Sequence, residues 1–372
     1  MPDYLALSVT CTCATLIFLW FVARKRNAPV PYPPGPKGLP IIGNALGIDL
    51  KTPQFTYATW GKIYGDVVYF NVFGQGFVVV NSEETARLLA DKRSTIYSDR
   101  PHSPIYSLFG IDRMTPVMPY GNDWRTHRKL FHSSLKADVV QKFHDVYLSN
   151  AWQLRHNIQS EPSKFSEHFK LFSGSLALEL TYGRKVEGKD DATIHFVSTI
   201  FDMLSRGTTP QSGGLLLAFP ILEHFPSWLP GLGFKAEAPR CREMIAAMAE
   251  LPFREAKTQL VSGTLQHCLV SDFLAYEGAG ESAAREAAAG VYLAAAESTA
   301  SILETVVLVM ILHPEIQANV HAELDDVIGK GVFPTFEDRP RLPYLQAVLY
   351  EVMRWNPVFP LGRWRDPICY RI

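Results

Sequence analysis

Cysteine is scarce in this sequence, and its scarcity excludes one class of small protein. Only five cysteines occur among 372 residues, too few and too scattered for a disulfide-stabilised scaffold. The sequence holds no CxxC pair and no Cys/His cluster, so we expect no zinc site. The HExxH and GxSxG motifs are also absent. The usual signatures of a metalloprotease and of an α/β-hydrolase are therefore missing.

An excess of basic residues is missing too. The chain has 36 Lys and Arg residues against 37 Asp and Glu residues, a formal net charge of −1. A near-neutral chain without a basic run is not expected to bind nucleic acid. Hydrophobic residues make up 47% and charged residues 20%, which are typical values for a globular protein. We therefore predict a folded chain with a substantial core.

Charge is absent from the segment Tyr4–Ala23 near the N-terminus. Its length of about 30 Å as a helix matches the hydrocarbon thickness of a bilayer. Three basic residues follow at positions 24–26, and positive flanks stay on the cytosolic side. We predict a single-pass signal-anchor with its basic stop over residues 1–26, in the endoplasmic reticulum membrane, and a body facing the cytosol. A cleaved signal peptide is the alternative, but its charges would precede the apolar run.

Proline marks two irregular stretches. Five prolines lie between Pro29 and Pro36, which excludes a helix there and predicts a stiff, extended hinge over residues 27–44. An SH3-type ligand is the alternative interpretation of this segment. A second stretch, Pro220–Gly233, combines prolines with aromatic residues and is interpreted as a packed connector or as a loop that touches the membrane.

The body shows one clear β signal. The apolar runs Asp66–Phe70 and Phe77–Val80 flank Gly74-Gln75-Gly76, a pattern that predicts a β-hairpin. Ser82 is a favoured N-cap residue, followed by two acidic residues. We therefore predict a helix from Ser82 to about Asp91.

Helical spacing dominates the rest of the chain, so the predicted fold class is mainly α with a small β-sheet (α+β). The longest candidate helix runs from Ser282 to His313 and is closed by Pro314. Its middle is apolar on nearly all sides, which indicates a helix buried in a large core or in a membrane. Glu297 and Glu304 argue against a second membrane span. We therefore place this helix in the interior of a large domain.

Three short patterns are candidates for chemistry. Small residues precede an acid and two hydroxyls in Ala294–Thr299, so a bulky group would have room to approach polar side chains. Trp124 and Arg128 share a helix face and suit a carboxylate or phosphate on a planar ligand. Glu351 and Arg354 have the spacing of a helical ion pair. Each pattern also has a plain structural interpretation: a satisfied polar cluster, a solvated basic helix, and a common chance spacing.

In their order along the chain, these segments resemble the cytochrome P450 family of haem-thiolate monooxygenases, in its membrane-bound fungal form. The resemblance rests on the apolar anchor and five further segments: PPGPKGLPIIGN (Pro33–Asn44), YGNDWRTHRK (Tyr120–Lys129), LAAAEST (Leu293–Thr299), HPEIQANVHAELDDVIG (His313–Gly329) and LPYLQAVLYEVMRWNPVFPLG (Leu342–Gly362). It implies a haem cofactor, an NADPH-dependent reductase partner, contact with membrane lipid, and hydroxylation or epoxidation of a small apolar metabolite, consistent with secondary metabolism.

The resemblance also implies roles for individual residues. Trp124 and Arg128 correspond to the pair that binds a haem propionate. Glu297 and Ser298 correspond to the acid and alcohol of the proton relay, with Thr299 beside them. Ala295 stands where relatives usually have glycine, which would narrow the haem-binding groove. Glu351 and Arg354 correspond to a buried structural pair.

After Gly362 the resemblance implies a further strand and a glycine-rich loop that carries the iron-ligating thiolate, and neither is recognisable in the sequence. We therefore interpret residues 45–362 as a C-terminally truncated catalytic domain and residues 363–372 as a non-homologous tail, with Cys369 in the wrong context for a metal ligand. The chain as written is expected to be inactive and unstable, with Val306–Ile311 left uncovered. The alternative function is a non-catalytic, membrane-anchored remnant or interaction protein.

Overall fold

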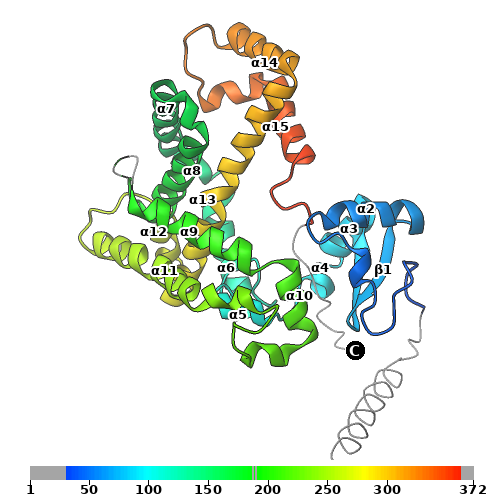
Figure 1. Ribbon diagram of the computed structural model, residues 1–372. Helices are drawn as coiled ribbons and strands as arrows, with labels where there is room; N and C mark the ends of the chain where they lie inside the picture. The colour runs from blue at the N-terminus through cyan, green and yellow to red at the C-terminus, as the bar shows by residue number, and fades with distance from the viewer. Residues whose placement is uncertain (1–30, 187, 189–190, 362–372) are drawn as a thin grey trace, which may run out of the picture. The chain divides into compact units, whose positions relative to one another are not determined.

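The computed structural model describes residues 31–361 except 187, 189 and 190. The predicted anchor at Tyr4–Ala23 and the predicted tail at 363–372 lie outside the described residues. Two compact units divide the chain, residues 1–97 and residues 98–372. The first carries the small sheet and the second is helical (Figure 1), so the predicted mainly α class with a small β-sheet is confirmed.

The sheet of the first unit is the predicted hairpin. Strands β1 (Val67–Val72) and β2 (Gln75–Val80) pair antiparallel, with Val67 opposite Val80 and Val72 opposite Gln75. Phe73 and Gly74 form the two-residue turn with φ of 49° and 84°. Positive φ at both positions matches the right-handed twist of the strands, and glycine adopts it without strain.

One face of the hairpin is covered by helix α2 (Pro53–Tyr64), whose Trp60 packs with Val68 and Phe70. The ring centroids of Trp60 and Phe70 are 5.3 Å apart. Ser82 caps helix α3 as predicted, because its hydroxyl accepts from the backbone N–H of Thr85 at 3.3 Å. The remaining elements of the unit are α3 (Glu83–Arg87), a π-helical turn (Leu88–Lys92), α4 (Ser94–Tyr97) and a 3-10 turn (Ala45–Gly47).

The described part of the predicted hinge, residues 31–44, has no helix or strand, ends in a turn at residues 39–44 and is fastened to β1. The backbone N–H of Tyr69 donates to the Pro34 carbonyl at 3.0 Å, and the Tyr32 ring stacks on the Tyr69 ring with centroids 4.2 Å apart. A Cβ at Gly35 would lie 1.8 Å from the Tyr69 carbonyl oxygen, so this close approach requires glycine. The segment is therefore part of the first unit, not a free connector.

The second unit consists of helices joined by short turns. The helices are α5 (Pro104–Phe109), α6 (Asn122–Leu135), α7 (His144–Ser160), α8 (Phe165–Tyr182), α9 (Ala192–Gly207), α10 (Pro210–Ala218), α11 (Ala238–Val261), α12 (Leu269–Ala275), α13 (Glu281–Leu312), α14 (Pro314–Val327) and α15 (Pro343–Trp355). Short 3-10 turns lie at Val140–Phe143, Pro162–Lys164, Pro220–His224, Gly233–Glu237 and Phe336–Arg341.

Helix α13 is the axis of this unit. It contacts α6, α8, α9, α11, α12, α14 and α15, and it runs lengthwise beside α8 in Figure 1. Within the described ranges it is also the one helix long and apolar enough to cross a membrane by length and composition. Its packing against seven helices makes it the core helix that the sequence predicted between Ser282 and His313.

Helices α8 and α13 run antiparallel and are joined by two serine hydroxyls. Ser173 donates to the carbonyl oxygen of Ala295 at 2.8 Å, and Ser166 donates to the carboxylate of Glu304. Alanines at positions 284, 287, 288 and 289 of α13 are buried, and their small side chains allow neighbouring helices to approach closely.

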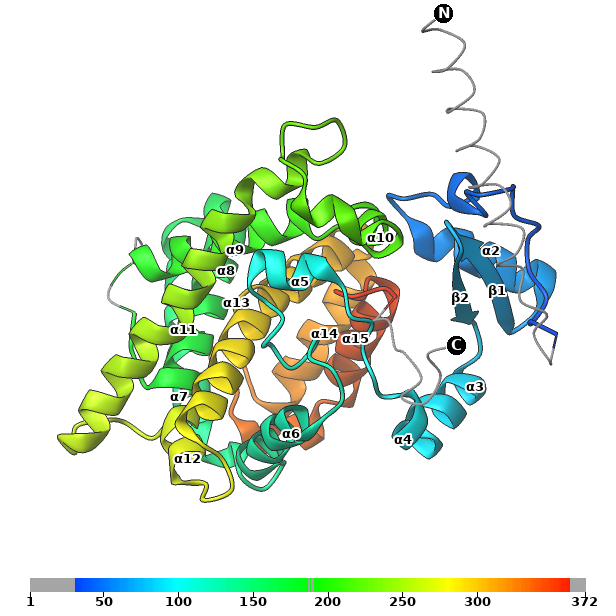
Figure 2. The same ribbon diagram turned by 90° about the horizontal axis from the view of Figure 1, so that it is seen from below.

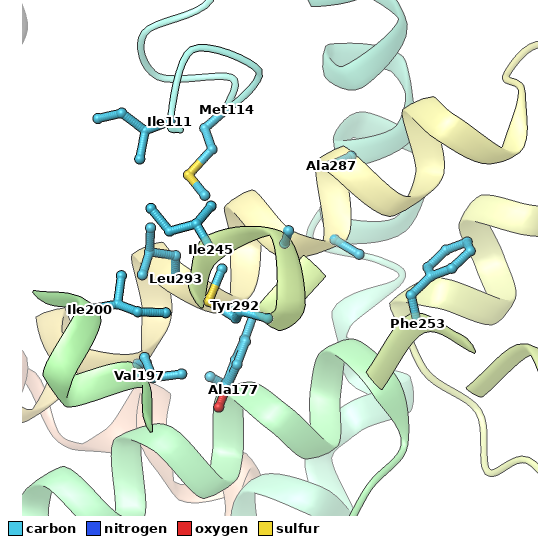
Figure 3. Packing of buried hydrophobic residues seen from close by; sticks show 14 of the residues in the cluster. Ile111, Met114, Ala177, Val197, Ile200, Ile245, Phe253, Ala287, Tyr292 and Leu293 are labelled. Atoms are coloured by element: carbon cyan, nitrogen blue, oxygen red, sulfur yellow. The ribbon is translucent and has the colours of Figure 1, made fainter. Parts of the chain in front are cut away.

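The main core surrounds the first half of α13. Figure 3 shows Tyr292 and Leu293 of α13 among Ala177 of α8, Val197 of α9 and Ile245 of α11. All five side chains are less than a tenth exposed. The sequence thus buries an almost continuous apolar surface around one helix, which is the main source of stability for such a unit.

A smaller core lies at the other end of α13, where α14 and α15 pack side by side (Figure 2). Val320, Val348 and Val352 form its centre, and Val306 and Met310 of α13 pack against them. The predicted exposure of Val306–Ile311 is therefore found only in part, at Leu308 and Ile311, which are 43% and 68% exposed.

Candidate active site

The middle of α13 is open on one side. Ala294 is exposed, although the neighbouring Leu293 and Ala296 are buried. Ser298 follows Ala294 by four residues and lies on the same face of the helix, where it is half-buried together with Ala295. This face carries small side chains and one hydroxyl, so it leaves room for a planar group.

Glu297 does not share that face. Its Oε1 accepts a hydrogen bond of 2.8 Å from the Ser198 hydroxyl of α9. Lys170 and Gly174 of α8 line the same narrow gap beside the Glu297 carboxylate. Successive residues of a helix differ in direction by about 100°. The structure therefore places the predicted acid and the predicted alcohol on different sides of α13, with Thr299 half-buried after them.

Trp124 and Arg128 are brought together on α6. The Arg128 guanidinium carbon lies 5.8 Å from the centre of the Trp124 ring system, within the range of a cation–π contact. Trp124 is half-buried and Arg128 is exposed. The ring of Tyr120 packs against Trp124 with a centroid separation of 5.1 Å, and Arg125 lies over the Tyr120 ring, so two aromatic rings and two cations lie together at the start of α6.

The opposite side of α6 is fixed by His127, which the sequence reasoning missed. Its ring is fully buried, and Nδ1 lies 2.9 Å from the Thr115 hydroxyl. Its Nε2 lies 3.8 Å from a carboxylate oxygen of Glu286 on α13. Burial lowers the pKa of His127, and the nearby Glu286 opposes this change. The only sequence signal was its position within the Tyr120–Lys129 segment.

Glu286 completes this link between α6 and α13. Arg113 donates from Nε to its Oε1 at 3.3 Å, and the Ser282 hydroxyl donates to the same oxygen at 3.1 Å. The buried contacts of His127 and Glu286 thus hold α6 beside α13, and with it the Trp124–Arg128 pair.

Glu351 and Arg354 form an ion pair on α15. Arg354 donates from Nε to Glu351 Oε2 at 2.7 Å and from a second nitrogen to the other carboxylate oxygen. Arg354 lowers the pKa of Glu351. Both side chains are exposed, at 71% and 60%, whereas the resemblance implied a buried pair. The reason is the helix face: Val348 and Val352 occupy the inward side of α15.

The cysteines of the described region do not suit a metal. Cys241 and Cys268 are both fully buried in the main core. Burial raises the pKa of Cys241 to about 11 and also raises that of Cys268, which disfavours the thiolate that ligates iron. Within residues 31–361, apart from the three positions not described, no group of three or more His, Cys, Asp or Glu side chains is placed to hold a metal ion.

Comparison with known proteins identifies the family. The family model "Cytochrome P450" matches residues 33–369. Cytochrome P450 monooxygenase COX1 of Coprinopsis cinerea is 33% identical over 95% of this chain and 72% of its own length. Cytochrome P450 monooxygenase 136 of Postia placenta is 34% identical over 97% of this chain and 69% of its own length. Both relatives are fungal proteins named as monooxygenases, a class of oxidoreductase. This chain therefore belongs to the cytochrome P450 family.

Proposed function

We propose that the chain belongs to a membrane-bound, haem-dependent monooxygenase that hydroxylates or epoxidises a small apolar metabolite in secondary metabolism. One observation carries the proposal. The open, small-residue face of α13 around Ala294 and Ser298 lies on a helix to which buried contacts fasten α6, and α6 presents the Trp124–Arg128 pair. The family membership supports this assignment.

The residues of this region fit the outer parts of a haem. Arg128 and the Trp124 indole would donate hydrogen bonds to a propionate, because a guanidinium and an N–H match carboxylate oxygens. When bound, haem would supply the oxygen chemistry. The Ser298 hydroxyl would hold a proton on the open face of α13, and Glu297 would deliver protons from the α9 side, where Ser198 fixes its carboxylate. Thr299 would assist Ser298, and Ala295 would narrow the groove by one methyl group.

The thiolate ligand is the part of the haem site that the described residues do not fit. Cys241 and Cys268 are buried as thiols inside the core. Cys369 lies outside the described residues, and its sequence context does not resemble a ligand loop. We propose that the residues printed do not form a haem–thiolate complex and are inactive by themselves, because none of these cysteines suits the ligand. A non-catalytic, membrane-anchored protein is the second candidate, favoured by the same cysteines.

The proposed location is the endoplasmic reticulum membrane, with the body in the cytosol and an NADPH-dependent reductase as redox partner. Exposed apolar side chains in the 220–233 stretch support contact with lipid. Ile221 and Trp228 are 63% and 78% exposed, more than an ordinary packed connector needs, and tryptophan is enriched where protein meets a membrane interface.

The test is haem reconstitution of the full chain. We expect haem to be retained in a manner that depends on Arg128, and the reduced carbonyl complex to lack a thiolate-type Soret band. A thiolate-type band would overturn the proposed inactivity. Haem retention that is equal in the wild type and in Arg128→Ala would overturn the proposed propionate site.

A further inference from the structure

Three backbone carbonyls converge on one lysine side chain between α10 and α11. The Lys235 ammonium donates to the carbonyl oxygen of Leu222 at 3.0 Å and to that of Glu223 at 2.6 Å. It also donates to the carbonyl oxygen of Phe225. A lysine ammonium has three N–H donors and no acceptor, so these three oxygens use its whole capacity. We call the carbonyls of Leu222, Glu223 and Phe225 the carbonyl cage.

A proline explains why this backbone needs a side-chain donor. Residues 220–224 form a 3-10 turn, in which a carbonyl accepts from the N–H three residues later. The residue three positions after Glu223 is Pro226, which has no N–H. Phe225 leaves the turn in an extended conformation, with φ of −81° and ψ of 149°. The Glu223 carbonyl therefore loses its 3-10 donor, and Lys235 supplies one from 12 residues further along the chain.

Lys235 reaches the carbonyl cage from a fixed piece of backbone. It lies in the 3-10 turn Gly233–Glu237, and its own N–H donates to the Leu232 carbonyl at 3.0 Å. At the end of this turn, the Glu237 carboxylate accepts hydrogen bonds of 3.1–3.3 Å from Arg206 of α9. The turn that carries the lysine is therefore fastened to α9, and this attachment fixes the direction from which the ammonium approaches.

The lysine joins the two ends of the segment 219–235. Leu222 near one end and Phe234 near the other both pack against the main core, whereas the neighbouring Ile221 is 63% exposed. Prolines at positions 220, 226 and 230 limit the backbone hydrogen bonds that the segment can form by itself. The ammonium therefore closes the segment into a loop and keeps Leu222 on the core side.

The carbonyl cage has the chemistry of a site for a small monovalent cation. Carbonyl oxygens attract cations through their dipoles and can replace a hydration shell. The nitrogen–oxygen distances of 2.6 and 3.0 Å to Glu223 and Leu222 suit an ammonium. They are longer than the distance of about 2.0–2.1 Å that Mg²⁺ requires, and Mg²⁺ usually also binds a carboxylate.

We infer that the carbonyl cage is a cation site whose resident cation is the Lys235 ammonium, and that a free primary ammonium ion can take the place of this side chain. The cation acts as a clasp: with it the segment 219–235 is closed, and without it the segment opens while the surrounding helices stay folded. The inference concerns the second unit alone and depends neither on haem nor on a membrane.

The experiment is chemical rescue of the full chain, followed by hydrogen exchange. Lys235→Ala removes the ammonium and leaves the space of its stem. We expect backbone amides of residues 219–235 to exchange at least about tenfold faster in this variant, because hydrogen bonds to a charged group are lost. Methylammonium at about 0.1 M should restore most of the protection by binding the closed form. Tetramethylammonium at the same concentration should not, because it carries the same charge but no N–H.

Two further variants separate the cation from the rest of the side chain. Lys235→Met keeps an apolar stem that packs as the lysine stem does and fills the space, so exchange should be fast with or without methylammonium. Lys257→Ala is the matched control on α11, because this exposed lysine pairs with Glu281 at 2.6 Å. It should leave the exchange of residues 219–235 unchanged.

Three results would overturn the inference. Wild-type exchange in Lys235→Met would show that the ammonium holds nothing in place. Fast exchange in Lys235→Ala that does not respond to methylammonium, or responds equally to both added cations, would show that the carbonyl cage does not recognise an ammonium. Faster exchange that extends through α8 in both Lys235 variants would show that the lysine supports the whole unit, which contradicts a local clasp.

Discussion

The hydroxyl of Ser198 and the carboxylate of Glu297 join α9 to α13 through a hydrogen bond of 2.8 Å. Both side chains are half-buried, so the serine supplies a donor to a carboxylate that is partly removed from water. Helix α9 therefore determines where the acid of α13 points.

Removing this donor should destabilise the second unit. Ser198→Ala is expected to lower the free energy of unfolding by about 1–3 kcal/mol, because a hydrogen bond to a charged group is lost. Thr199→Ala is the matched control, since Thr199 is a half-buried neighbour whose hydroxyl donates to the His195 carbonyl within α9. Urea unfolding of both variants provides the measurement. Equal effects would contradict a special role for Ser198.

Gly207 should not tolerate a methyl group. A Cβ at this position would lie 2.0 Å from the Phe109 ring, which is fully buried. Gly207→Ala is expected to cost about 1–3 kcal/mol of stability through overpacking.

The control for this change is Gly214→Ala in α10, where a Cβ would meet no atom within 4 Å. It is expected to be neutral or to stabilise by about 0.5–1 kcal/mol through helix propensity. The changes in thermal midpoint caused by the two substitutions should differ in sign, or clearly in size. A stable Gly207→Ala protein would show that the Phe109 ring can move.

His127 should make stability depend on pH. Burial lowers its pKa below the ordinary value of 6.5, while Glu286 and Asp123 oppose and Arg113 reinforces the shift. The unfolded chain therefore binds a proton near pH 6.5 that the folded chain binds only at lower pH. The contribution of His127 to the free energy of unfolding is therefore fully present above pH 6.5 and is lost as the pH falls below that value.

His127→Gln should weaken this dependence between pH 7.5 and pH 5.5, whereas His132→Gln, an exposed change on the same helix, should leave it unchanged. Urea unfolding of the wild type and of both variants across this pH range measures how the free energy of unfolding changes with pH. Parallel curves for the wild type and His127→Gln would rule out the assignment.

Arg128 should be needed for haem retention. Arg128→Ala is expected to weaken haem binding about tenfold, because one charge-assisted hydrogen bond to a propionate is lost. Arg125→Ala is the control on the same helix, as Arg125 bonds Asn122 and lies over Tyr120. Titration with haem followed by Soret absorbance compares the variants. Comparable losses for both would indicate a general effect of positive charge.

The local features of the fold were predictable because local residues determine them. The turn around Gly74, the cap at Ser82 and the boundary at Pro314 each follow from the conformational preferences of a few residues. The length and burial of α13 followed from its apolar composition, and the pair of Trp124 and Arg128 from helical spacing.

Long-range partners were not predictable from single segments. Ser198 and Glu297 are 99 residues apart, and nothing in either segment specifies the other. Ser166 and Ser173 of α8 are seven residues apart, yet they bond different kinds of group on α13, the Glu304 carboxylate and the Ala295 carbonyl. The exposure of Glu351 depended on which side of α15 faces the core.

The pairing of α8 with α13 also has a consequence during synthesis. Ser173 and Ala295 are 122 residues apart, so α8 leaves the ribosome long before its partner exists. At about 5–20 residues per second the delay is roughly 6–25 s. During that time the apolar side of α8 is without the helix that covers it in the folded unit. The nascent chain should therefore require chaperone protection until translation passes the end of α13.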